Sequence, residues 1–138
     1  MLRTVPVEAG DAHDQGTFDD RGIAWDGETR RQTLVGANLA GHDSHGVGMV
    51  PRYVKSLLNA ELMLNRQVEI DQDTGSIVAL DGRRGMGQSV AHQAMQVAIA
   101  RARTHGVCVM GLRNSHHLGR VGHWAEQAIA AGFASVHF

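Results

Sequence analysis

The chain has 138 residues, of which 43% are hydrophobic, and this suits one modest globular domain or a piece of a larger one. Its formal net charge is -1 with both signs interspersed, so composition offers no basic surface for nucleic acid or for an anionic membrane. No apolar run approaches the roughly 18 residues of a membrane span, no signal segment is evident, and the lone Cys108 lies in an apolar run. We therefore expect a soluble, cytoplasmic protein without disulfides.

The first half of the sequence predicts an arm followed by two helices. Residues 1–28 show neither helical nor strand periodicity, so an irregular arm is expected there. Apolar residues then recur at helical spacing up to Gly41, a common helix terminator, and Pro51 suits the first turn of a second helix. The segment 29–66 is accordingly predicted to be helical, with residues 41–48 as the loop between its helices.

The second half, residues 67–138, switches between strand and helix patterns at glycines. A β-rich run before the turn residues DTG predicts a hairpin, and the later order of strand, loop, helix and strand indicates a crossover. The fold class is thus α/β, a mixed sheet with flanking helices. An apolar edge strand ending at Phe138 suggests a truncated domain. The predicted elements are strands near 77–80, 107–112 and 134–138 and helices near 88–105 and 121–131.

Two polar loops hold most of the groups that can move protons, residues 41–48 (GHDSHGVG) and 113–120 (RNSHHLGR). Histidine titrates near neutral pH, so it can take a proton from a substrate hydroxyl and return one to a carbonyl. Arg52, just beyond the first loop, could hold a carboxylate, or it is simply a surface charge on its helix. The polar loop residues singled out are His42, Asp43, Ser44, His45, Arg113, Asn114, Ser115, His116, His117 and Arg120. Core or half-buried packing positions are expected at Tyr53, Leu57, Val97 and Trp124.

Three other kinds of site fit the residues less well. A zinc site would need the adjacent His116 and His117 to join a first-loop histidine, but neighbouring histidines rarely converge on one ion. The stretch GMGQSV (85–90) lacks the third glycine and the later acidic residue of a Rossmann dinucleotide site. Ser44 and His45 are adjacent, which seldom directs both side chains to one atom as nucleophilic catalysis requires. No metal site is predicted.

Three ordered motifs carry a family resemblance: GHDSHGVGMVPRYVKSL, LDGRRGMGQSVAHQAMQVAI and GVCVMGLRNSHHLGRVGHWAEQAIAAGF. Together they resemble the N-terminal part of the malate/L-lactate dehydrogenase family, and most of all its hydroxycarboxylate dehydrogenase B subgroup. The resemblance runs from about Thr33 to Phe138, whereas the first 30 or so residues do not match. It implies a fold that binds NAD or NADP without a Rossmann domain, reversible reduction of 2-oxo acids to 2-hydroxy acids, and a homodimer.

The resemblance also implies roles for individual residues. The histidine of the family's SHG motif falls on His45, which would exchange the substrate's hydroxyl proton next to the cofactor. From the residues alone, either Ser44 or Asp43 could fix the His45 ring by hydrogen bonding. The second-loop histidine falls on His117, a second candidate for proton transfer or substrate orientation. Many relatives carry an arginine at the position of Met49, so Arg52 is the nearest substitute, and Asn114 is the other expected substrate contact. The cofactor is expected at Leu118, Gly119 and Arg120.

The leading hypothesis is therefore a 2-hydroxy acid dehydrogenase acting on a small substrate such as malate or lactate. Because most of the family's cofactor-binding segment lies beyond the matched region, the chain alone is expected to be inactive or nearly so. The alternative is a non-catalytic remnant that folds or pairs with a partner chain. The choice between NAD and NADP, and the identity of the 2-hydroxy acid, are left open by these residues.

Overall fold

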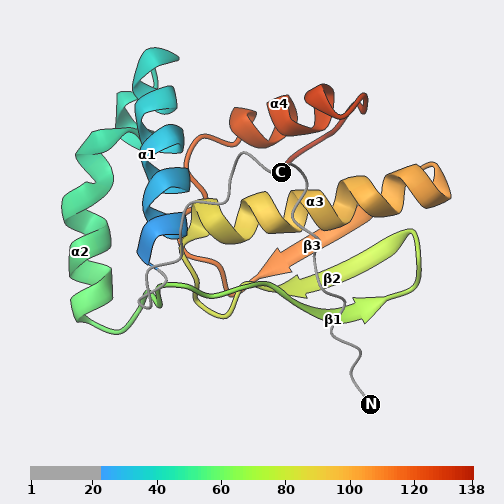
Figure 1. Cartoon of the computed structure of the whole chain (residues 1–138), viewed down its shortest axis with the longest axis horizontal. Helices are drawn as coiled ribbons and strands as arrows, with labels where there is room; N and C mark the ends of the chain where they lie inside the picture. Colours follow the sequence, from blue (N-terminus) through green and yellow to red (C-terminus); the bar gives the residue numbers. More distant parts are fainter. Residues whose placement is uncertain (1–22) are drawn as a thin grey trace.

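The computed structural model describes residues 23–138, and the first 22 residues of the predicted arm lie outside this range. Two helices stand side by side at one end of the molecule, and a small sheet with two further helices forms the rest (Figure 1). Two short 3-10 turns, Asp43–His45 and Val47–Met49, connect the first two helices. The helices are α1 (Ile23–Leu39), α2 (Val50–Leu58), α3 (Gly87–His105) and α4 (Gly122–Ala130), and the strands are β1 (Glu69–Asp73), β2 (Ile77–Asp81) and β3 (Val109–Arg113).

The sheet has the order β1-β2-β3 and is mixed, as predicted. Strands β1 and β2 form the expected antiparallel hairpin around the DTG turn, where Gly75 takes a φ of +90° that favours glycine. Strands β2 and β3 pair in parallel, with Ile77 opposite Val109 and Asp81 opposite Arg113. Helix α3 makes the crossover between them. The parallel pairing places the ends of β2 and β3, and the loops that follow, at the same edge of the sheet.

The core lies between the sheet and α3, and between α3 and α4. Alternate residues of β2, Val78 and Leu80, point at Ala94 of α3 and are fully buried. On the opposite side of α3, Met95 packs with Trp124 of α4. Each fully buried large apolar side chain contributes about 1.5–3 kcal/mol. Helix α3 is thus the central layer (Figure 1), which fixes the position of its N-terminus.

Three stretches differ from the prediction. Helix α2 ends at Leu58, so residues 59–66 of the segment predicted to be helical are not helical. Helix α1 begins at Ile23, so residues 23–28 of the expected arm are helical. A helix anchored by buried residues such as Leu34 and Ala37 extends at low cost through residues of poor propensity. The strand predicted near 134–138 is wrong, because these residues form no strand. An apolar pattern becomes a strand only with a hydrogen-bonding neighbour, and no described strand pairs there.

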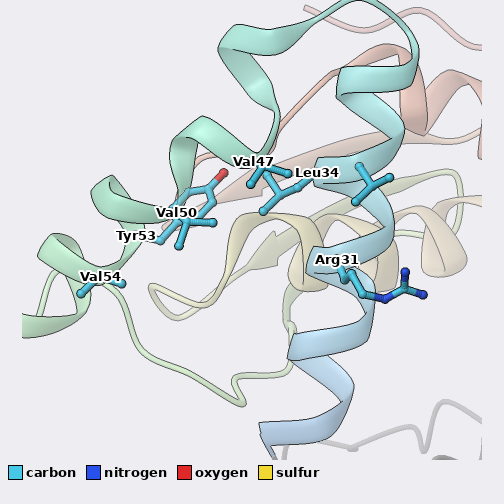
Figure 2. A pocket seen from close by; sticks show the side chains of 7 residues that line it. Arg31, Leu34, Val47, Val50, Tyr53 and Val54 are labelled. Atoms are coloured by element: carbon cyan, nitrogen blue, oxygen red, sulfur yellow. The ribbon is translucent and has the colours of Figure 1, made fainter.

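Helix α2 buries less of its apolar face than predicted. Tyr53 is 2% exposed in a cluster with Leu34, Leu62 and Met86, whereas Leu57 is exposed and its prediction as a packing residue is wrong. Side chains of α1, of α2 and of the turn between them line an open apolar groove of about 280 Å³. Figure 2 shows these side chains from close by. The groove is lined by Arg31, Leu34, Val35, Val47, Val50, Tyr53 and Val54. Trp124 is buried and Val97 is half-buried, as predicted.

Candidate active site

The first polar loop, residues 41–48, is attached to the end of α1 by one side chain. The amide nitrogen of Asn38 donates to the Asp43 carboxylate, and its oxygen accepts the backbone N–H of Val47 at 2.9 Å. A Cβ at position 46 would lie 2.2 Å from that same oxygen, so a larger residue than Gly46 would displace the Asn38 amide. Asn38 thus holds the loop in the shape that presents the two histidines within it.

The second polar loop, residues 113–120, is attached through main-chain contacts. The backbone N–H of His116 donates to the carbonyl of Gly85 at 3.1 Å. A Cβ at position 87 would lie 2.0 Å from the carbonyl oxygen of His117, so Gly87 allows this loop to cross directly over the start of α3. Asn114 turns the chain with a φ of +52°, a conformation that asparagine tolerates better than most residues.

The two loops meet at His45 and His117. Their imidazole rings stack with centroids 5.3 Å apart and planes 28° apart, although the residues are far separated in the chain. Ser44 Oγ lies 2.9 Å from His45 Nδ1, which is one of the two ring-fixing contacts expected from the sequence, whereas the Asp43 carboxylate bonds Asn38 instead. The ring of His42 stands edge-on to His45 at 6.4 Å and extends the group. The predicted convergence of the two loops is therefore present in this chain.

Tyr53 and Gln88 complete the surroundings of His117. The Tyr53 hydroxyl lies 3.0 Å from His117 Nδ1, and the Gln88 amide nitrogen donates to that hydroxyl at 2.7 Å. Gln88 is fully buried at the start of α3, and the Tyr53 ring also meets the His116 ring edge-on at 5.7 Å. His117 is therefore supported by α2 and α3 as well as by its own loop.

Burial and nearby positive charge keep the second-loop histidines neutral. Burial lowers the pKa of His117 most, and the charges of His45, Arg52 and His116 lower it further. Burial also lowers the pKa of His116, with help from Arg52 and against the pull of Glu61. Both shifts favour the neutral imidazole, which carries one ring proton, over the charged imidazolium. Arg52 itself is exposed on α2, and its predicted contact with the substrate stays a prediction.

The structure gives the other predicted site residues structural contacts. The Asn114 amide donates to the Asp81 carboxylate at 2.9 Å. Leu118 packs against the cluster around Trp124. Gly119 is buried with a φ of +78°, where an added Cβ would meet the Gln88 amide at 3.3 Å. These three contacts leave the predicted roles of Asn114, Leu118 and Gly119 in ligand binding as predictions.

Arg120, the remaining predicted cofactor contact, is paired with a carboxylate. Its guanidinium donates to both oxygens of Glu126, at 2.8 and 2.7 Å, and this bond raises the pKa of Arg120 and lowers that of Glu126. A Cβ at position 122 would collide with the same guanidinium at 2.7 Å. In this structure the Arg120 guanidinium is therefore engaged by Glu126, and its predicted contact with the cofactor stays a prediction.

The described residues were also compared with the requirements of a metal site and of a membrane span. Among residues 23–138, no three histidine, cysteine or carboxylate side chains are grouped so that they could hold a metal ion. Within the same range, no helix has the length and apolar character needed to cross a membrane.

Sequence reasoning missed three residues of the site. Tyr53 follows an apolar helical pattern and was assigned to packing, which is correct for its ring but omits its hydroxyl. Gln88 lies in the stretch that resembles an incomplete dinucleotide motif, and Asn38 is near the end of α1. No one-dimensional signal marks these polar groups, because their partners are 64, 35 and 5 to 9 positions away along the chain.

Comparison with known proteins identifies the architecture. The profile of the family described as malate/L-lactate dehydrogenase matches residues 24–138. Hydroxycarboxylate dehydrogenase B of Escherichia coli O157:H7 is 52% identical over 105 residues, 76% of this chain and 29% of that protein. L-lactate dehydrogenase of Cupriavidus necator is 41% identical over 105 residues, which are 76% of this chain and 30% of the relative.

A solved structure agrees with these sequence matches. Malate dehydrogenase from Pyrococcus horikoshii OT3 superposes with a TM-score of 0.75 at 30% identity, covering 81% of this chain and 34% of that one. The chain thus spans about a third of the length of the relatives it matches.

Proposed function

Because this chain belongs to the malate/L-lactate dehydrogenase family, we propose that it carries the acid–base centre of a 2-hydroxy acid dehydrogenase. The reaction is the reversible transfer of a hydride between NAD or NADP and a small 2-hydroxy acid such as malate or lactate, with the 2-oxo acid as product. The observation that supports this most is the stacking of His45 on His117 at 5.3 Å, since both motif histidines of the resemblance meet at one point.

In the proposed reaction, each residue of the site has a different role. Oxidation of a hydroxyl needs a base for its proton while the nicotinamide, when bound, accepts the hydride. His45 takes that proton, and the Ser44 hydroxyl at its Nδ1 fixes the ring so that Nε2 is left for substrate. His117, held neutral, contacts the same substrate oxygen. Arg52, whose charge already acts on His117, attracts the carboxylate of the acid.

The proposed reaction needs the rest of the fold that the longer relatives contain. We propose that the chain alone turns over substrate very slowly, since it spans about a third of its relatives. We also propose a homodimer for the whole protein, to be checked by light scattering.

The test is a chimera in which residues 33–138 replace the matching segment of E. coli hydroxycarboxylate dehydrogenase B. The chimera should oxidise 2-hydroxy acids with NAD or NADP, and His45→Ala should lower turnover by about a hundredfold to ten-thousandfold. His42→Ala is the matched control, because this exposed imidazole is 6.4 Å from His45 and should change turnover only a few-fold. Equal effects of the two substitutions would remove His45 from the acid–base role. A folded chimera without any dehydrogenase activity would favour the non-catalytic alternative.

A further inference from the structure

A row of hydrogen bonds runs from the interior of the protein to the stacked histidines. It starts at Gln88, which is fully buried, passes through the hydroxyl of Tyr53, which is 2% exposed, and ends at Nδ1 of His117. The three residues come from α3, α2 and the second loop. None of the contacts is local in sequence, so the row exists only because these three elements pack together.

The row has a direction that follows from the number of protons available. The Gln88 amide nitrogen can only donate, so the Tyr53 oxygen accepts that bond. The hydroxyl has one proton of its own and lies 3.0 Å from His117 Nδ1. With the Gln88 amide already donating to the Tyr53 oxygen, the assignment consistent with both bonds is that the hydroxyl donates its proton to Nδ1. A nitrogen that accepts a hydrogen bond is unprotonated, and the neutral ring then carries its proton on Nε2.

We propose that Tyr53 and Gln88 are positioning residues that fix the tautomer of His117, so that its Nε2–H serves as a hydrogen-bond donor to the substrate oxygen. This inference rests on the proposed function and divides the labour between the two stacked rings. His45, with only Ser44 at its Nδ1, remains the group that exchanges the hydroxyl proton. His117 polarises the same oxygen without being consumed as a base.

The surroundings of His117 support a neutral donor. A protonated ring would place a second proton on Nδ1, and the Tyr53 hydroxyl would have to turn its own proton away to accept it. Burial and the positive charge of Arg52 act in the same direction, because they lower the pKa of His117. The hydrogen-bond row and the burial of the ring beside a positive charge therefore each disfavour the protonated form of His117.

The experiment is nitrogen NMR of the histidine rings in the full 15N-labelled chain, with the His117 signals identified by their loss in His117→Gln. Native His117 should show a protonated Nε2 and an unprotonated Nδ1. Tyr53→Phe keeps the buried ring and removes only the donor, so the pKa of His117 should rise by about 0.5–1 unit, the equivalent of one net hydrogen bond. Gln88→Met should shift the same pKa in the same direction by less, because the hydroxyl remains but is free to turn.

Ser89→Ala is the matched control, because the Ser89 hydroxyl is equally buried, adjacent to Gln88 and without a hydrogen-bond partner within the described residues. It should leave the His117 signals unchanged. A native proton on Nδ1 would overturn the proposal, since it would mean that the Gln88 amide is turned the other way. An unchanged pKa in Tyr53→Phe, or an equal shift in Ser89→Ala, would overturn it too.

The NMR result is separable from the proposed function. If the tautomer responds as expected while the chimera has no dehydrogenase activity, the proposed function fails and the assignment of the His117 tautomer stands. If the chimera is active and His117 carries its proton on Nδ1, the positioning role fails alone.

Discussion

The two loops that meet at the candidate site are held by different means. Residues 41–48 are attached through the side chain of Asn38, which bonds Asp43 and Val47. Residues 113–120 are attached through the main chain, which passes over Gly87 with no room for a side chain. A side chain can rotate away from a clash, whereas packed backbone cannot. A substitution in the first loop should therefore disorder that loop and leave the fold intact. A substitution that displaces the second loop should destabilise the whole fold.

The largest effect should come from Gly87→Ala. The added Cβ would lie 2.0 Å from the His117 carbonyl oxygen and 2.5 Å from that of His116, and both are backbone atoms. We expect a loss of about 3 kcal/mol in the free energy of unfolding, measured by urea denaturation. Gly36→Ala is the control, because nothing lies within 4 Å of its Cβ and alanine favours the helix. A Gly87 variant as stable as the Gly36 variant would show that the second loop is not held by this contact.

A smaller effect is expected from Gly46→Ala in the first loop. Its Cβ would lie 2.2 Å from Asn38 Oδ1, so the amide must rotate and give up its bonds to Asp43 and Val47. The expected cost is about 1 kcal/mol, the net value of such hydrogen bonds. Once Asn38→Ala has removed the clashing group, adding Gly46→Ala should cost little more. Strictly additive losses would contradict the idea that Asn38 alone holds this loop.

The two loops should also differ in their effect on pH dependence. Burial lowers the pKa of His116 and His117 in the folded chain, and unfolded histidine titrates near 6.5. Between the folded pKa and about pH 6.5 the unfolded state therefore binds more protons than the folded state. The contribution of these histidines to the free energy of unfolding is fully present above about pH 6.5 and is lost as the pH falls toward the folded pKa. Urea denaturation should give a lower unfolding free energy at about pH 5.5 than at about pH 7.5.

The variant His116→Gln/His117→Gln should flatten that pH dependence. A residual slope is expected from His123, whose pKa is lowered chiefly by burial. An equal slope in the double variant and the native chain would show that the second-loop histidines do not titrate differently on folding.

The smallest effect should come from the Arg120–Glu126 pair at the end of the second loop. Glu126 is 59% exposed, so Glu126→Gln should lower the free energy of unfolding by only about 0.5 kcal/mol. The same variant releases the guanidinium. If Arg120 contacts the cofactor, the chimera with Glu126→Gln should bind NADH as tightly or more tightly, and Arg120→Ala should weaken binding, both measured by nicotinamide fluorescence. Unchanged binding in Arg120→Ala would leave the arginine a structural role only.

Much of the fold was predictable because its signals are local. The hairpin, α3 and α4 follow from apolar periodicity, turn residues and glycines within short stretches. Pro51 correctly indicated the first turn of α2. The errors at residues 23–28 and 134–138 share a cause, because both segments depend on tertiary contacts. Packing of its later residues extends α1 through residues 23–28, and residues 134–138 have no neighbouring strand in the described part of the chain with which to pair. The local sequence of these segments does not encode either contact.

The sequence by itself determined which chemical groups are present and which family the chain resembles, since both depend on residue identity and order. His45, His117 and Arg52 were all identifiable in this way. Only the tertiary structure decided that the two rings stack and that Gln88, through Tyr53, supports one of them. The reason is physical: a hydrogen bond depends on distance and direction in space, and the packing of α2 and α3 against the second loop sets both.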